Sequence, residues 1–338
     1  MHALPDGALR IVHLSDAHLT GDGSLHQGVV DTTAALDRVL AEADRVPGAR
    51  LLVGSGDLSD DGSVASYEAL RSRASAWAGR HGAHVALVPG NHDLRGGFAA
   101  VLGHGHGRGG GRGGDGGGAD LRAAADSRAG DSVASAREAD SRAADLRATD
   151  GPPEGVEPGP VDGASEVDGW RVVTLDTSVP RAGYGLLRDA QLDRLRDLLS
   201  TPARRGTVLV LHHPPLPAPT TLHESLALQR PEALGRVIEG TDVRVVLAGH
   251  YHHHVAGSLV GVPVLVAPGV ANDTDVLAAP GTERAVRGSG FLVVDVHPDG
   301  TVRSTPVRVA GPDDGSTVFE LDEERTAAIA AAAGVPRG

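Results

Sequence analysis

Short apolar segments alternate with helical patterns along the chain, and five of these segments end in a turn that carries Asp, Asn or His. Runs rich in Val, Leu and Ile predict strands at residues 9–14, 50–55, 84–89, 170–175, 207–211, 243–248, 262–267 and 291–296. Amphipathic spacing predicts helices near 30–46, 64–80, 187–200 and 230–239. This alternation of strands and helices is typical of an α/β fold.

Turn chemistry supports two of these boundaries. Pro231 and Glu232 are favourable residues for the first turn of the helix near 230–239. Asp299 and Gly300 follow the last strand, and this dipeptide predicts a hairpin that returns along residues 301–309.

Residues 103–168 depart from the α/β pattern. The segment begins "GHGHGRGGGRGGDGGG" and continues with repeats of Ala, Asp, Arg and Ser. Such a composition buries too little apolar surface to offset the chain entropy, so we expect a low-complexity, disordered insertion. Residues 1–102 and 169–310 would then form a single domain, and residues 311–338 a C-terminal tail with one helix.

The composition limits both the chemistry and the partners. The chain contains no Cys, which excludes disulfides, thiolate metal ligands and cysteine nucleophiles. Its formal net charge of −13 disfavours broad binding to a nucleic-acid polymer. The first residues lack the pattern of a secretory signal, and no apolar run reaches the roughly 18 residues of a membrane span. We therefore expect a cytoplasmic protein without a stable membrane span.

The five turns carry side chains that bind cations. They are Asp16-Ala17-His18, Gly56-Asp57, Gly90-Asn91-His92-Asp93, His212-His213-Pro214-Pro215 and Gly249-His250-Tyr251-His252. Since ligands of open α/β sheets bind at the carboxyl ends of strands, these turns are expected to converge on one patch. Carboxylate, amide and imidazole groups suit Mn, Fe(II), Zn or Co better than calcium.

The spacing within the turns indicates separate roles. In an extended segment, Asp16 and His18 point to the same side and can chelate one ion. His250 and His252 can do the same or divide between two ions, and Asp57 is a natural bridge between cations about 3.5–4 Å apart. Taken singly, Asp16 or Asp57 is more often a turn or helix cap than a ligand. Taken singly, His250 and His252 are surface residues about as often as they are ligands. Five such turns in chain order favour one shared site.

In this order, D-x-H, G-D, G-N-H-D, H-H-P-P and G-H-x-H resemble the motifs of the calcineurin-like metallophosphoesterases. The resemblance covers the chain outside residues 103–168 and the tail. It implies a four-layer α-β-β-α sandwich of two mixed sheets, with two divalent metal ions, either Fe and Mn or two Mn. The implied ligands are Asp16, His18, Asp57 and His252 for one ion, and Asp57, Asn91, His212 and His250 for the other.

The resemblance also implies roles in binding and turning over a substrate. His92 would hydrogen-bond a phosphoryl oxygen or protonate the leaving alkoxide. Asp93 would orient the imidazole of His92, the alternative being a cap of the next turn. Asn91 and His18 are expected contacts with the substrate. His223 is a further expected contact because of its place in the polar loop "PAPTTLHESL", and a loop position without a role in binding is the alternative.

Within this family, residues 211–269 are most similar to bacterial class III cyclic nucleotide phosphodiesterases of the actinobacterial type. The similarity implies hydrolysis of 3′,5′-cyclic nucleotides, cAMP first and cGMP second, by water activated between the two cations. A broad phosphodiesterase for glycerophosphodiesters or 2′,3′-cyclic nucleotides is the second hypothesis, and a non-enzymatic metal-dependent scaffold is the third. The expected partner is a small-molecule phosphodiester, and a homodimer is one expected assembly.

Overall fold

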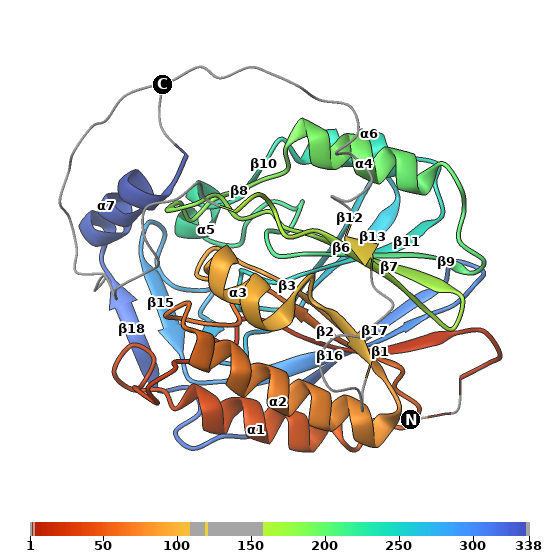
Figure 1. Ribbon diagram of the computed structural model, residues 1–338. Coiled ribbons are helices and arrows are strands. Elements are labelled where there is room, and N and C mark those ends of the chain that lie inside the picture. The colour runs from red at the N-terminus through yellow and green to blue at the C-terminus, as the bar shows by residue number, and fades with distance from the viewer. Residues whose placement is uncertain (1, 3, 109–118, 121–157, 336–338) are drawn as a thin grey trace.

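Two large mixed β-sheets form the centre of the computed structural model, which describes residues 2, 4–108, 119–120 and 158–335 (Figure 1). The first sheet has the order β17 (Val302–Val309), β16 (Ser289–Val296), β1 (Leu9–Leu14), β2 (Leu51–Ser55), β3 (His84–Val88) and β4 (His106–Arg108). The second has the order β12 (Val255–Leu259), β13 (Val262–Val266), β11 (Val243–Ala248), β9 (Gly206–Leu211), β7 (Trp170–Leu175), β6 (Gly163–Val167) and β5 (Ala119–Asp120). The neighbours β1, β2 and β3 are parallel, as are β13, β11, β9 and β7, while the outer strands are antiparallel.

Helices cover the outer face of each sheet. The helices α1 (Thr32–Ala43) and α2 (Val64–His81) pack on the first sheet, and α4 (Asp189–Leu199) and α6 (Pro231–Ile238) pack on the second (Figure 1). A third core, built mainly from Val, Leu and Ile with Trp170, lies between the two sheets. The predicted four-layer α-β-β-α sandwich is therefore confirmed.

Smaller elements surround the ends of the strands. The helices α3 (Arg95–Leu102) and α5 (Thr221–Ser225) follow the turns after β3 and β9. Two small sheets pair β8 (Gly185–Leu186) with β10 (Leu228–Gln229), and β14 (Asp273–Thr274) with β15 (Glu283–Val286) and β18 (Thr317–Leu321). The last helix, α7 (Glu323–Ala333), is the helix predicted for the tail.

Most strand boundaries agree with the sequence to within one or two residues, but the predicted limits of the insertion are wrong at both ends. β4 at 106–108 pairs with β3, and β6 at 163–167 pairs with β7. Their glycine-rich or polar sequences lack strand periodicity, so pairing with a neighbouring strand decides their conformation. Residues 109–118 and 121–157 of the expected insertion lie outside the described residues.

The tail also differs from the prediction. It contributes β18 to a small sheet before α7 begins, because its backbone pairs with β15. This pairing joins segments more than thirty residues apart, and a local pattern does not reveal it.

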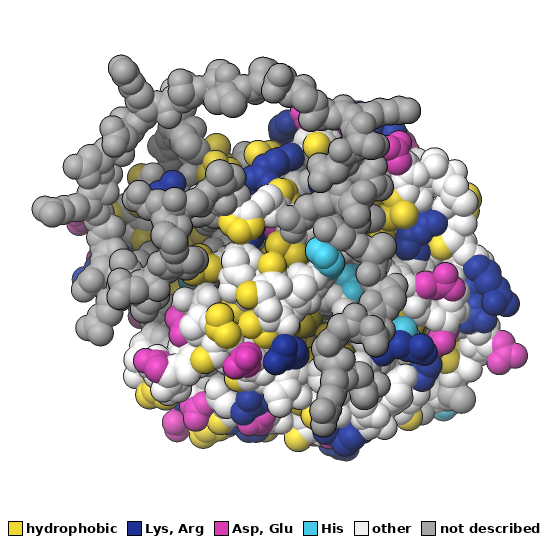
Figure 2. All heavy atoms as spheres, in the orientation of Figure 1, with side chains coloured by type: hydrophobic (Ala, Val, Ile, Leu, Met, Phe, Trp, Pro, Cys, Tyr) yellow, Lys and Arg dark blue, Asp and Glu magenta, His cyan; other side chains and the backbone are white. Residues whose placement is uncertain are grey.

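The charged surface over α1 and α2 carries both signs. Arg73 pairs with Asp37 and Arg80 pairs with Asp44, and basic and acidic side chains lie side by side over these helices (Figure 2). Within the described part of the chain, no helix combines the length and the apolarity needed to cross a bilayer.

The core between the sheets gives a test of this architecture. Leu247 is fully buried there, so Leu247→Ala should lower the free energy of unfolding by about 2–5 kcal/mol, because it removes apolar contacts and leaves a cavity. Leu277 is 89% exposed, and Leu277→Ala should change that free energy by less than about 0.5 kcal/mol. Guanidinium denaturation of both variants measures the difference; equal effects would contradict the assigned core.

Candidate dinuclear metal centre

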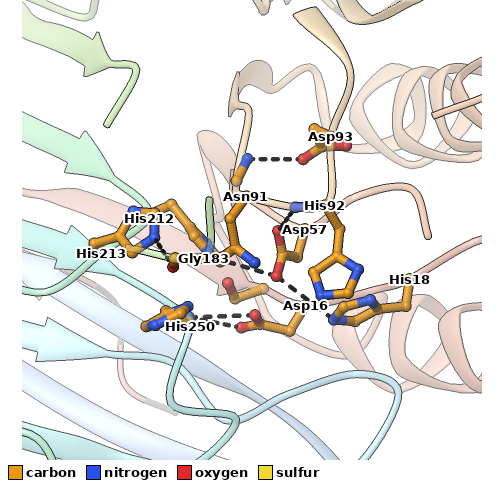
Figure 3. Close-up of polar contacts among 12 residues, drawn as sticks. Asp16, His18, Asp57, Asn91, His92, Asp93, Gly183, His212, His213 and His250 are labelled. Atoms are coloured by element: carbon orange, nitrogen blue, oxygen red, sulfur yellow. Dashed lines mark hydrogen bonds and ion pairs between the residues drawn. The ribbon is translucent and has the colours of Figure 1, made fainter. Parts of the chain in front are cut away.

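Asp57 lies at the centre of a cluster formed by the five turns. Its Oδ2 is 3.3 Å from His212 Nε2 and 3.7 Å from His18 Nε2. In Figure 3 it lies between Asn91 and His212 on one side and His18 and His92 on the other. His212 Nε2 is also 3.1 Å from Asn91 Oδ1. One carboxylate therefore faces two separate groups of nitrogen and oxygen atoms.

The first of these groups contains Asp16, His18 and His252. His252 Nε2 is 3.4 Å from Asp16 Oδ1 and 3.2 Å from His18 Nε2. Two imidazole nitrogens with lone pairs do not attract each other unless a proton or a cation lies between them. This approach is typical of ligands that share one metal ion.

The second group contains His212 and His250 beside Asn91. Potential ligand atoms of His212 and His250 lie within 4.8 Å of one another, and the backbone N–H of His250 donates to Asp16 at 3.1 Å. The buried Nε2 of His250 has no hydrogen-bond partner among the described residues. An orphaned buried nitrogen costs free energy, and a bound cation would remove that cost.

The distances between these ligand atoms fit metal coordination. Zinc-like ions bind His and carboxylate ligands at about 2.0–2.2 Å, so neighbouring ligand atoms of one ion lie about 2.8–3.6 Å apart in octahedral or tetrahedral geometry. The contacts of His252 with Asp16 and His18, and of His212 with Asn91 and Asp57, fall in this range. The oxygen and nitrogen donors suit borderline divalent metals.

Five of the predicted ligands have a left-handed backbone conformation. They are Asp16, His18, Asp57, His250 and His252, with φ between 46° and 71°. Residues other than Gly adopt this conformation in only a few per cent of cases, and such strain is concentrated at functional sites. These five ligands belong to three of the turns that meet at Asp57, and six further non-glycine residues with positive φ lie elsewhere in the described part of the chain.

Two of the motif glycines are required by close approach rather than by backbone flexibility. A Cβ atom at Gly90 would clash with Oδ1 and the backbone nitrogen of Asp57. A Cβ at Gly249 would clash with the hydroxyl of Ser15 and lie 2.9 Å from Asp16 Oδ2. These glycines let the turns approach the carboxylates directly.

Hydrogen bonds set which ring nitrogen faces the cluster. His212 Nδ1 donates to the Ser55 carbonyl at 2.8 Å, which leaves Nε2 toward Asp57. His213, next along the chain, uses both nitrogens elsewhere: Nδ1 with Thr177 Oγ1 at 2.8 Å, and Nε2 with the Gly183 carbonyl at 3.0 Å. The choice of His212 over His213 as the ligand agrees with these contacts.

Burial and neighbouring charges shift the pKa values of the cluster. Burial lowers the pKa of His18 and of His252 to about 4, and burial together with His213 holds that of His250 well below its usual range. These three rings are neutral at pH 7, the form that binds metal. Burial also raises the pKa of Asp16 to about 6.

His212 and His92 respond differently because they lie close to Asp57. Burial acts to lower the pKa of each ring, but the Asp57 carboxylate raises both to about 9. Protons and metal cations compete for the same carboxylate and nitrogen atoms. Cation binding at Asp57 and at Nε2 of His212, a proposed ligand, should therefore displace the proton of His212.

Asp93 does not orient His92, so that prediction is wrong. Its carboxylate accepts the backbone N–H groups of Gly90 at 2.8 Å, Ser59 at 3.0 Å and Leu58 at 3.1 Å. It thereby ties the turn after β3 to the turn after β2. Backbone amides this close satisfy both oxygens, and the ring of His92 needs another partner.

That partner is Asp60, a residue that the motif analysis missed. Asp60 Oδ1 is 3.0 Å from His18 Nδ1 and 3.4 Å from His92 Nδ1. Burial favours the neutral carboxyl, but the contacts with the three neighbouring histidines hold the pKa of Asp60 far below its usual range. Its position three residues after Asp57, in "GDLSDDG", is the only local signal.

His223 belongs to α5, and its ring lies against that of His250. The two rings meet edge to face with centroids 5.5 Å apart, and His223 Nδ1 is 2.9 Å from Thr220 Oγ1. Burial lowers the pKa of His223 to about 3, so the ring carries no charge at pH 7. Its location favours support of His250 over charge stabilisation of a phosphate; a contact with substrate stays a prediction.

The paired ligand groups and the two-sheet sandwich define a dinuclear metallophosphoesterase. Residues 9–254 match the family model described as "Calcineurin-like phosphoesterase", and the chain belongs to this family. Calcineurin-like phosphoesterases use a dinuclear metal centre, and the clustered His and Asp side chains fit one.

Curated relatives cover most of the chain. It is 35% identical over 306 residues to a "cAMP/cGMP dual specificity phosphodiesterase" of Mycobacterium tuberculosis (strain CDC 1551 / Oshkosh), which covers 90% of this chain and 80% of that protein. It is 33% identical over 297 residues to a "Probable cyclic nucleotide phosphodiesterase" of Rhodococcus erythropolis, covering 87% and 82%. A "3′,5′-cyclic adenosine monophosphate phosphodiesterase" of Pseudomonas aeruginosa is 26% identical and covers 94% of both chains.

Among solved structures, the chain is similar to a purple acid phosphatase from yellow lupin. The TM-score is 0.51 at 12% identity, and the match covers 96% of this chain and 55% of that one. At this identity the similarity establishes the fold alone.

Gly90 gives a direct test of the close approach at Asp57. In Gly90→Ala the new methyl group must displace Asp57, so we expect Mn²⁺ affinity to fall about tenfold or more. Gly96, in α3, has open space around its Cβ position, and Gly96→Ala should retain wild-type affinity. Calorimetric titration with Mn²⁺ compares the two variants, and wild-type affinity in Gly90→Ala would refute the assigned packing.

Proposed function

We propose that this protein is a metal-dependent phosphodiesterase that hydrolyses 3′,5′-cyclic nucleotides, cAMP first and cGMP second, to nucleoside monophosphates. The observation that carries the proposal is the convergence of five strand-end turns on Asp57. The printed names of the relatives that cover most of the chain supply the substrate class. A small-molecule phosphodiester is the proposed partner, and a cytoplasmic location and a homodimer remain predictions.

The proposed metal sites share one carboxylate. Asp16, His18, Asp57 and His252 would hold one ion, and Asp57, Asn91, His212 and His250 the other; Fe and Mn, or two Mn, are the proposed pair. Ions bound there would neutralise the charge of a phosphodiester and activate water for attack on phosphorus.

His92 is the proposed general acid. Its backbone N–H donates to Asp57 Oδ1 at 2.9 Å, which holds the residue beside the cluster. Its Nδ1 faces Asp60, so Nε2 is left for the substrate, and the side chain is 40% exposed. A proton delivered from Nε2 to the departing ester oxygen would avoid release of a free alkoxide. Asn91 and His18 would lie close enough to the ions to contact the bound phosphate.

The substrate class is tested with a hydrolysis panel. The Mn²⁺-loaded protein is incubated with cAMP, cGMP, 2′,3′-cAMP, a glycerophosphodiester and bis(p-nitrophenyl) phosphate, and products are separated by chromatography. We expect conversion of cAMP to AMP, with cGMP as a second substrate. Cleavage of the glycerophosphodiester or 2′,3′-cAMP without any cleavage of cAMP would establish the broad phosphodiesterase hypothesis instead.

Asp57→Asn should reduce kcat for cAMP by about a thousandfold or more, because the bridging negative charge is lost from both ion sites. Asp37→Asn is the matched control, since Asp37 is an exposed residue on α1 that pairs with Arg73. It should keep wild-type kcat. Steady-state kinetics and circular dichroism of both proteins separate loss of chemistry from loss of fold; substantial turnover by Asp57→Asn would exclude its bridging role.

Removal of metal should abolish hydrolysis reversibly. Dialysis against EDTA is expected to leave the protein folded and without phosphodiesterase activity, because water then lacks its activating cations. Addition of Mn²⁺ should restore the activity, with Mg²⁺ less effective, since Mg²⁺ is a hard cation that takes oxygen ligands and the candidate ligands include several imidazoles. Full activity after exhaustive chelation would contradict the metal requirement.

A further inference from the structure

His26 is a buried histidine beside the centre that none of the motifs includes. It lies in the loop between β1 and α1 and is 4% exposed. Its backbone N–H and C=O pair with Val30 at 2.9 and 3.0 Å, and Val30 packs against Ala285 and Val318 of the small three-stranded sheet. The ring of His26 is therefore held in place from outside the metal centre.

The imidazole of His26 faces the carboxylate that orients His92. His26 Nδ1 is 3.1 Å from Asp60 Oδ2, a close ion-pair contact without the alignment of a hydrogen bond, while His18 and His92 approach Oδ1 of the same carboxylate. The two oxygens of a carboxylate rotate together about one broad torsion. A partner at Oδ2 therefore fixes where Oδ1 points.

The contact between His26 and Asp60 matters because solvent reaches the Asp60 carboxylate. Asp60 is 25% exposed at its side chain, so water can compete with the imidazoles for its oxygen atoms. The buried ring of His26 occupies the position at Oδ2 and also lies against His18, with ring centroids 4.7 Å apart. Without that ring, water would gain access to both the carboxylate and the side of His18.

We propose that His26 is a positioning residue for phosphodiester hydrolysis: by fixing Oδ2 of Asp60, it holds Oδ1 where it orients His92 and His18. The inference rests on the proposed function of the centre. His26 does not contact the substrate or the ions in this role. It acts through Asp60 on the ring that donates the proton and on one metal ligand.

The test compares His26→Leu with His26→Asn. Leu has a similar volume and no donor, whereas the amide nitrogen of Asn can occupy the place of Nδ1. His81→Leu is the matched control, since His81 Nε2 also pairs with an aspartate, Asp44 at 3.0 Å, but on α2 away from the centre. All three variants are measured with cAMP and with bis(p-nitrophenyl) phosphate, whose leaving group needs no protonation.

We expect His26→Leu to lower kcat for cAMP about tenfold with KM changed less than about twofold. The loss with bis(p-nitrophenyl) phosphate should be smaller, about threefold or less, because only His92 depends on the leaving group. His26→Asn should recover most of the activity, and His81→Leu should match the wild type. An unchanged kcat in His26→Leu, or an equal loss on both substrates without recovery in His26→Asn, overturns the proposal.

A failure of the proposed function gives a different result. In that case the wild-type protein binds Mn²⁺ but leaves cAMP intact. Titration with Mn²⁺ then decides the role of His26, since His18 depends on the same carboxylate. Affinity that falls in His26→Leu and recovers in His26→Asn supports the positioning role, and wild-type affinity in His26→Leu rejects it.

Discussion

Two carboxylates buried where the sheets meet, Asp16 and Asp57, set the constraint on which the rest of the site depends. Their ion-pair partners within the site are imidazoles, at 3.3–3.7 Å. A buried carboxylate without compensation costs roughly several kcal/mol. The rings of His18 and His252 are neutral and supply lone pairs rather than positive charge, and the proton of His212 competes with a cation for the same site. Divalent cations satisfy both kinds of group at once. Burial of carboxylates beside imidazoles costs free energy when the protein folds, and the same burial favours the binding of cations.

The packed core of the two sheets stabilises the strained backbone of the ligand turns. Left-handed backbone at the ligand turns costs about 1–3 kcal/mol per residue, and the packed core and the hydrogen bonds between turns hold it in place. Asp16 N–H donates to the Gly56 carbonyl at 3.0 Å, and Gly249 N–H donates to the His212 carbonyl at 2.9 Å. The first bond joins neighbouring turns of one sheet, and the second joins neighbouring turns of the other. Parallel strands make both bonds available because their carboxyl ends share an edge.

The turn after β2 supplies two carboxylates to the site, Asp57 and Asp60. "GDLSDDG" places Asp57 at the centre of the candidate metal ligands and Asp60 next to them, against His18 and His92. The two carboxylates differ in burial, and this difference suits their roles. Asp57 is almost fully buried, while Asp60 is partly exposed and relies on several imidazoles to hold its position.

The sequence by itself determined the strands, the fold class and the residues that gather at the centre. Each predicted strand is a short local run of β-branched or leucine-rich residues, and five of these runs are followed directly by a turn with polar side chains. The tertiary structure decided the partners of those side chains: Asp93 binds backbone amides, Asp60 orients His92, and His26 faces Asp60. It also decided the strands at 106–108 and 163–167. The physical reason is that the apolar runs of the predicted strands are local in the chain, whereas these contacts and pairings depend on which segments the packed sheets bring within about 3 Å of each other.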